Sequence, residues 1–191
     1  MEHEMTEILH DDKQNLVARE DCVLAIIDIQ EKLLPAISDK EKVTENIVRL
    51  IRFSNIVGLP IVVTEQEKLG NTIPELKKQL GDFQPISKTH FNCFSCNDFA
   101  DRIDKIGRRT LILAGVEAHI CVAQTAIFAL PRFNVHIISD AVSSRARENH
   151  IVSIERMRQY GATISSTEMF IYELLQKAGT DEFKATLPLV K

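Results

Sequence analysis

The chain has 191 residues, of which 45% are hydrophobic and 26% are charged, proportions typical of one compact globular domain. Its 27 acidic residues outnumber 23 basic ones, and a formal net charge of -4 does not favour binding to nucleic acid or to an anionic membrane surface. The apolar runs are far shorter than the roughly 18 to 20 residues that a membrane-spanning helix needs. We therefore expect neither a nucleic-acid partner nor a membrane partner.

The N-terminal residues 1–19 lack the apolar core of a secretory signal, and we interpret them as a tail. The four cysteines are too few and too scattered for a disulfide framework, which favours a reducing compartment. We expect the cytoplasm, with the mitochondrion as the alternative. Cys93 and Cys96 form a C-x-x-C pair, but no second pair of ligands completes a zinc site, so a structural role is favoured over a redox or metal-binding one.

Short continuous apolar runs recur along the chain, a pattern typical of strands that are covered on both faces. They predict a parallel sheet. The third run is weak, and the last is short. In chain order the predicted strands are residues 23–27, 61–63, 83–86, 111–114, 135–138 and 162–164.

Stretches with helical spacing of apolar residues separate these strands. One predicted helix ends at Gly58, which suits a left-handed cap, and another covers 122–130 before a proline. A third covers 149–160, with Ile151 and Ile154 expected to face inward. The last helix begins at 165–168, where Ser-Ser-Thr-Glu has the spacing of a capping box, and its expected buried residues are Ile171, Leu174 and Leu175.

Alternation of strand and helix predicts an α/β fold of three layers, α/β/α, with a doubly wound parallel sheet. We place the domain at residues 20–178. Residues 179–191 are interpreted as a second tail that is disordered or packs on a neighbouring subunit. No glycine-rich phosphate-binding motif follows the first strand, so no nucleotide cofactor is expected.

Three reactive side chains fall at strand ends of this predicted sheet, where the active sites of open parallel sheets form. Asp28 follows the first apolar run, Lys88 follows the weak one, and Cys121 lies where a helix begins. Each has an ordinary alternative: a helix cap, a surface charge and a buried thiol. Together they could form a catalytic unit in which the carboxylate takes the thiol proton and the ammonium stabilises the anionic forms of the carboxylate and the thiol. The helix N-terminus is expected to stabilise the thiolate.

The segments around these residues resemble the isochorismatase-like hydrolase superfamily of cysteine hydrolases, over about residues 20–177. The resemblance is closest to an isochorismatase-domain subgroup without a settled substrate. It implies a six-stranded, Rossmann-like parallel sheet, the catalytic triad Asp28, Lys88 and Cys121, and a homo-oligomer. It also implies a cis peptide bond between Val116 and Glu117, with the backbone amides of Glu117 and Cys121 forming an oxyanion hole. The segments that carry it are 26–30, 87–89, 114–122 and 124–126.

Two departures narrow the function that the resemblance implies. Nicotinamidases of this superfamily place histidines after the second strand to hold a metal, whereas residues 64–71 contain no histidine. We therefore expect neither a metal nor a cofactor. True isochorismatases cleave a vinyl ether and lack the nucleophilic cysteine, whereas Cys121 is present, so covalent acyl transfer fits better.

Other residues are weaker candidates for the substrate pocket. They are Gln30, Gln66, Phe91 and His119, and for His119 a packing role is the alternative. Phe91 and Phe94 could form an apolar lid or belong to the core.

The sequence thus predicts a metal-independent hydrolase that acts on a small amide or related carbonyl compound through a thioester on Cys121. One alternative is a binding or scaffold protein in which Cys121 is at most redox-sensitive. Another is vinyl-ether hydrolysis, which would survive the loss of Cys121 but not of Asp28.

Overall fold

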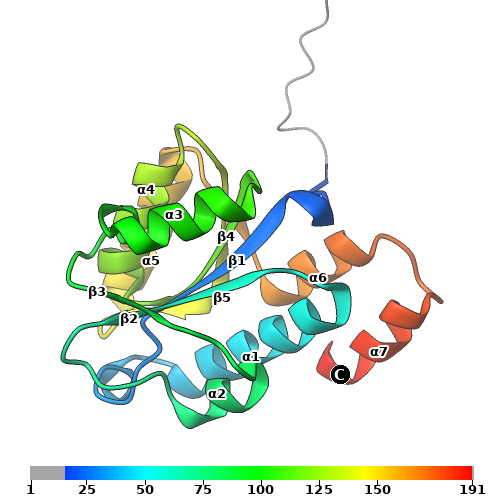
Figure 1. The fold of residues 1–191 in the computed structure, drawn as a ribbon, viewed down its shortest axis with the longest axis horizontal. Coiled ribbons are helices and arrows are strands. Elements are labelled where there is room, and N and C mark those ends of the chain that lie inside the picture. Colours follow the sequence, from blue (N-terminus) through cyan, green and yellow to red (C-terminus); the bar gives the residue numbers. More distant parts are fainter. Residues whose placement is uncertain (1–15, 191) are drawn as a thin grey trace, which may run out of the picture.

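The computed structural model of the chain describes residues 16–190. Within them, one six-stranded sheet has the order β3-β2-β1-β4-β5-β6, with every neighbouring pair parallel. Helices cover both faces, as Figure 1 shows, which confirms the predicted three-layer α/β/α fold. The strands are β1 (Cys22–Ile27), β2 (Ile61–Gln66), β3 (Ile86–Lys88), β4 (Thr110–Val116), β5 (Asn134–Ser143) and β6 (Thr163–Ser165).

Seven α-helices lie within the described residues, and they divide between two hydrophobic clusters, one on each side of the sheet. The first cluster involves α1 (Lys40–Val57), α2 (Pro74–Leu80), α6 (Thr167–Leu175) and α7 (Asp181–Val190). The second involves α3 (Asn97–Ile106), α4 (Ala123–Ala129) and α5 (Arg147–Gln159). None of the helices within 16–190 is long and apolar enough to cross a membrane.

The central strands explain why continuous apolar runs mark this sheet. Every residue of β1 and β4 is buried. Successive side chains of a strand point to opposite faces, so Leu24 and Ile26 join the first cluster while Val23 and Ala25 join the second. A strand that packs on both faces buries all its side chains, and burying a polar side chain costs free energy unless it is hydrogen-bonded. Such strands therefore consist mostly of consecutive apolar residues.

Several local predictions were wrong. In α5, Ile154 packs against the second cluster as predicted, but Ile151 is 58% exposed. Ser153 and Met157 are buried, because residues four apart share the helix face that meets the sheet. Helix α6 is capped by Ser166, whose side chain accepts the N–H of Met169, so no capping box forms with Glu168. The third strand was placed too early, because it spans 86–88. Neither α2 nor α3 was predicted from the sequence.

The C-terminal segment belongs to the packed fold. Residues 181–190 form α7, which lies against α1 and buries Thr186 and Leu189, in contrast to the expected tail. Most of the expected N-terminal tail lies outside the described residues. Its described part is anchored: the N–H of Val17 donates to Glu173 of α6 at 2.9 Å, and Arg19 pairs with Glu182 of α7 at 2.7 Å.

Candidate active site

Asp28, Lys88 and Cys121 come together at the carboxyl end of the sheet. Asp28 directly follows β1 in a left-handed conformation with φ 55°, and Lys88 is the last residue of β3. Cys121 lies in a π-helical turn, Ala118–Val122, between β4 and α4. Because the strands are parallel, segments far apart in the sequence end at the same edge.

The Lys88 ammonium bridges the other two side chains. Its Nζ donates to Oδ2 of Asp28 at 2.7 Å and lies 3.8 Å from the sulfur of Cys121. The three residues are 0% (Asp28), 2% (Lys88) and 6% (Cys121) exposed, so the ion pair is almost completely desolvated. The structure thus brings the three predicted side chains into one buried cluster.

Residues of β2 complete this cluster. The hydroxyl of Thr64 donates to Oδ1 of Asp28 at 2.7 Å, and Oε1 of Gln66 accepts from Lys88 Nζ at 2.7 Å. Both carboxylate oxygens of Asp28 are therefore engaged, as a buried charge requires. Thr64 was not among the residues predicted from the sequence, although it is the first polar residue after the apolar run of β2.

The electrostatics of the cluster keep the sulfur protonated at rest. Burial, followed by the negative charge of Asp28, raises the pKa of Cys121 above the usual thiol range, although Lys88 acts in the opposite direction. The net direction is thus opposite to the stabilisation of the thiolate that was expected from the following helix. For Lys88, burial is the largest single cause and lowers the pKa. The charge and hydrogen bond of Asp28, together with the smaller contributions of Cys93 and Cys121, act in the opposite direction, and the net pKa lies above its ordinary value. The resting cluster holds an ammonium, a carboxylate and a neutral thiol.

The backbone after β4 is held from both sides. The peptide bond between Val116 and Glu117 is cis, and Gly115 has φ +117°. A Cβ at Gly115 would lie 2.1 Å from the carbonyl oxygen of Ile27 in β1, so no other residue fits there. The carboxylate of Glu117 accepts the backbone N–H of Arg145 at 2.9 Å and its Nε–H at 3.1 Å. This anchors the segment whose amides are the predicted oxyanion hole.

Comparison with known proteins identifies the family. Residues 22–169 match the family model of the isochorismatase domain. The chain belongs to the isochorismatase family. It is 34% identical to isochorismatase domain-containing protein 2A of Mus musculus over 178 residues, which cover 90% of this chain and 84% of the relative.

Two solved structures share the fold. The MAR1 ribonuclease of Caenorhabditis elegans has 34% sequence identity and a TM-score of 0.84, with 91% of each chain covered. The ycaC gene product of Escherichia coli, an octameric hydrolase of unknown specificity, has 26% identity and a TM-score of 0.83, with 90% of this chain and 91% of that chain covered. Membership of the isochorismatase family points to hydrolysis as the class of reaction.

The four pocket candidates of this isochorismatase-family chain have different surroundings. Gln30 is fully buried, and its side-chain amide bonds the backbone of Gln66 and the carbonyl of Gly70, so it supports the loop behind Lys88 instead of lining a pocket. Gln66 is partly buried and binds Lys88 directly. Phe91 is 51% exposed, whereas its neighbour Phe94 packs in the core.

The fourth pocket candidate, His119, is partly buried two residues before Cys121. Its Nδ1 lies 2.9 Å from the hydroxyl of Ser144, which follows β5. This contact ties the turn that carries Cys121 to the segment after β5. The bond fits either of the two roles weighed for His119, a pocket wall or packing.

Within residues 16–190, no three His, Cys, Asp or Glu side chains gather closely enough to hold a metal ion. Histidines 3 and 10 lie outside the described residues.

Proposed function

We propose that this chain is a metal-independent hydrolase that cleaves a small amide or related carbonyl compound through a thioester on Cys121. The observation that carries the proposal is the Lys88 ammonium, placed 2.7 Å from an Asp28 oxygen and 3.8 Å from the Cys121 sulfur inside a desolvated site. Membership of the isochorismatase family supports hydrolysis as the reaction class.

The raised pKa of Cys121 implies that the proton leaves the sulfur only as the sulfur attacks the substrate carbonyl. Asp28 takes that proton while Lys88 remains charged beside it. The oxyanion forms on the former carbonyl and is bound by the backbone amides of Glu117 and Cys121. Asp28 then gives the proton to the leaving amine, and the acyl group stays on sulfur.

Water completes the reaction. Asp28, again a carboxylate, takes a proton from a water molecule that attacks the thioester carbonyl. The carbon–sulfur bond breaks, the carboxylic acid leaves, and the sulfur recovers its proton. The fixed ion pair with Lys88 keeps Asp28 in place through both halves of the cycle.

Cleavage of RNA, the activity for which the nematode relative is named, is less favoured for this chain, because a net charge of -4 does not attract a polyanion. A homo-oligomer is part of the proposal and draws support from the octameric bacterial relative.

The test is a screen of small amides, ureido acids and nicotinamide for release of ammonia or acid, with acylation followed by intact mass. Cys121→Ala and Asp28→Asn should each lower turnover by more than about a thousandfold. Cys96→Ala, a thiol outside the cluster, is the matched control and should leave turnover unchanged. Acylation retained in Cys121→Ala would reject the nucleophile. Amide hydrolysis that survives Cys121→Ala but not Asp28→Asn would reject the thioester.

A further inference from the structure

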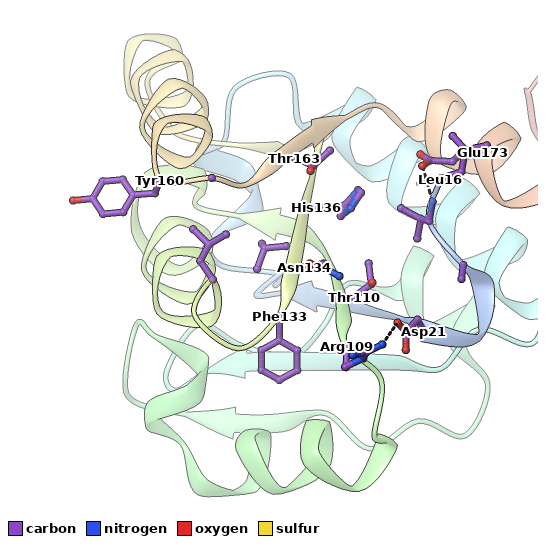
Figure 2. A pocket seen from close by; sticks show the side chains of 15 residues that line it. Leu16, Asp21, Arg109, Thr110, Phe133, Asn134, His136, Tyr160, Thr163 and Glu173 are labelled. Carbon is purple, nitrogen blue, oxygen red and sulfur yellow. Dashed lines mark hydrogen bonds and ion pairs between the residues drawn. The ribbon is translucent and has the colours of Figure 1, made fainter. Parts of the chain in front are cut away.

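A second site is built at the opposite end of the sheet from Asp28. A cavity of about 610 Å³ is lined there by the first residues of three strands, Thr110 of β4, Asn134 of β5 and Thr163 of β6. Figure 2 shows this cavity, which also receives side chains from α6 and from the chain before β1. Its volume is within the range of pockets that hold small molecules, roughly 300 to 1,000 Å³.

His136 of β5 lines this cavity with unused hydrogen-bonding capacity. The residue is 8% exposed, and its Nδ1 is buried with no partner among the described residues. Burial lowers the pKa of His136, while the charge of Glu173 acts in the opposite direction, so the ring is neutral near pH 7 and one of its nitrogens accepts. Buried polar atoms without a partner are few in native structures; in the described residues Ser54 and His150 also carry one, and of the three only His136 lines this cavity.

Glu173 supplies an uncompensated charge beside this ring. Its carboxylate accepts the N–H of Val17 at 2.9 Å, and within residues 16–190 no cationic side chain pairs with it. In Figure 2 the Arg109 guanidinium lies away from Glu173 and is already paired with Asp21 at 3.6 Å. The cavity therefore carries an excess negative charge at the Glu173 end.

We propose that this cavity binds a small organic cation, a primary amine with a short apolar body. The ammonium donates to the Glu173 oxygen that Val17 does not use and to a nitrogen of the neutral His136 ring. The hydrocarbon part lies on the apolar wall formed by Leu130, Phe133 and Val135. This site is separate from the proposed catalytic cluster and does not depend on it.

The test compares three probes of similar size but different charge, n-butylamine, 1-butanol and butyrate, by calorimetric titration of the full chain at pH 7.5 and constant ionic strength. Butylamine should bind saturably and at least tenfold more tightly than the other two. Glu173→Gln keeps an acceptor for Val17 but loses the charge, and should weaken butylamine binding at least tenfold. Glu168→Gln, an exposed carboxylate on the same helix, is the matched control and should change nothing.

Nuclear magnetic resonance of the histidine rings locates the bound amine. The ring signals assigned to His136 by their loss in His136→Gln should shift during the butylamine titration. Tighter binding of butyrate would overturn the proposal in favour of an anion site at Arg109. Equal binding of butanol, absence of any binding, or an unaffected Glu173→Gln variant would also overturn it. Amide turnover is not part of these measurements, so the outcome is independent of the proposed hydrolase.

Discussion

The two ends of the sheet differ in whether their buried polar groups have hydrogen-bond partners. At the carboxyl end, Asp28 and Lys88 satisfy each other and the hydroxyl and amide of two neighbouring side chains, and the cluster is closed from solvent. At the amino end, around a cavity of about 610 Å³, Nδ1 of His136 has no hydrogen-bond partner and Glu173 has no cationic partner among the described residues. A saturated network holds reactive groups in fixed positions, whereas unsatisfied groups around a space are prepared for a ligand.

The largest effect is expected from a change in the backbone packing between β4 and β1 at the carboxyl end of the sheet. Gly115→Ala should lower the free energy of unfolding by more than about 4 kcal/mol, because the new Cβ would lie 2.1 Å from a backbone oxygen of β1. Gly58→Ala is the control, since Gly58 also has a positive φ but nothing lies within 4 Å of its added Cβ, and about 1 kcal/mol is expected. Urea denaturation measures both. Equal losses would show that β1 and β4 are not packed as described.

The next test breaks the buried ion pair. Lys88→Met should lower the free energy of unfolding by about 3 to 5 kcal/mol, because it leaves the Asp28 charge buried without a partner. The double variant with Asp28→Asn should be more stable than the sum of the single losses predicts. Arg132→Met, which breaks the exposed pair with Asp104, is the control and should cost less than about 1 kcal/mol. Additive losses in the cycle would contradict the pairing.

The protonation state of the sulfur sharpens the contrast with an ordinary exposed thiol. Since burial and Asp28 raise the pKa of Cys121, its alkylation by iodoacetamide should still be accelerating above pH 8.5, about where a free thiol titrates. Asp28→Asn removes one cause of the increase and should move the profile to lower pH. Mass spectrometry of the Cys121 peptide gives the rates, with glutathione as reference. A plateau at or below neutral pH would contradict the raised pKa.

The smallest effect is expected at the amino end of the sheet, where His136 lines the cavity. Burial lowers the pKa of His136 in the folded state, so as pH falls through about 6.5 the unfolded chain takes up a proton before the folded chain does. Stability should therefore decline over that window, by at most about 1.4 kcal/mol per pH unit for this one group. His136→Gln should flatten the decline, and His90→Gln, at an exposed position, should not. The measurement is the denaturation midpoint of each variant between pH 5 and 7.5. If the midpoint of His136→Gln fell with pH as steeply as that of the unchanged chain, the effect of burial on His136 would be contradicted.

Strands β1, β2, β4 and β5 were predictable because each contains an apolar run, and so was the helix that ends at Gly58, whose φ is +70°. Strand β3, with the sequence Ile-Ser-Lys, contains no such run, and it was placed too early. Helix α3 was missed although Phe99 and Ile103 have helical spacing, since two apolar residues among many charges are a weak signal. The inward face of α5 was predicted correctly for Ile154 and wrongly for Ile151, because the apolar side chains of this helix do not all face the sheet.

The catalytic candidates were found at strand ends, where a parallel sheet gathers reactive groups, and from the resemblance around Cys121. Thr64 was missed because a threonine at the end of an apolar run is common and carries no motif. His136 and Glu173 stand 37 positions apart, and only the packing of α6 against β5 brings them to one cavity.

From its sequence alone this chain reveals its fold class and most of its strands, because the periodicity of apolar residues records which faces are buried. It also predicts that a carboxylate, an ammonium and a thiol lie near the ends of strands. Tertiary structure decides which atoms touch, because contacts between distant residues depend on how the sheet and helices pack. Burial likewise determines whether the sulfur of Cys121 keeps its proton and which polar groups lack a partner. No local sequence pattern predicts either property.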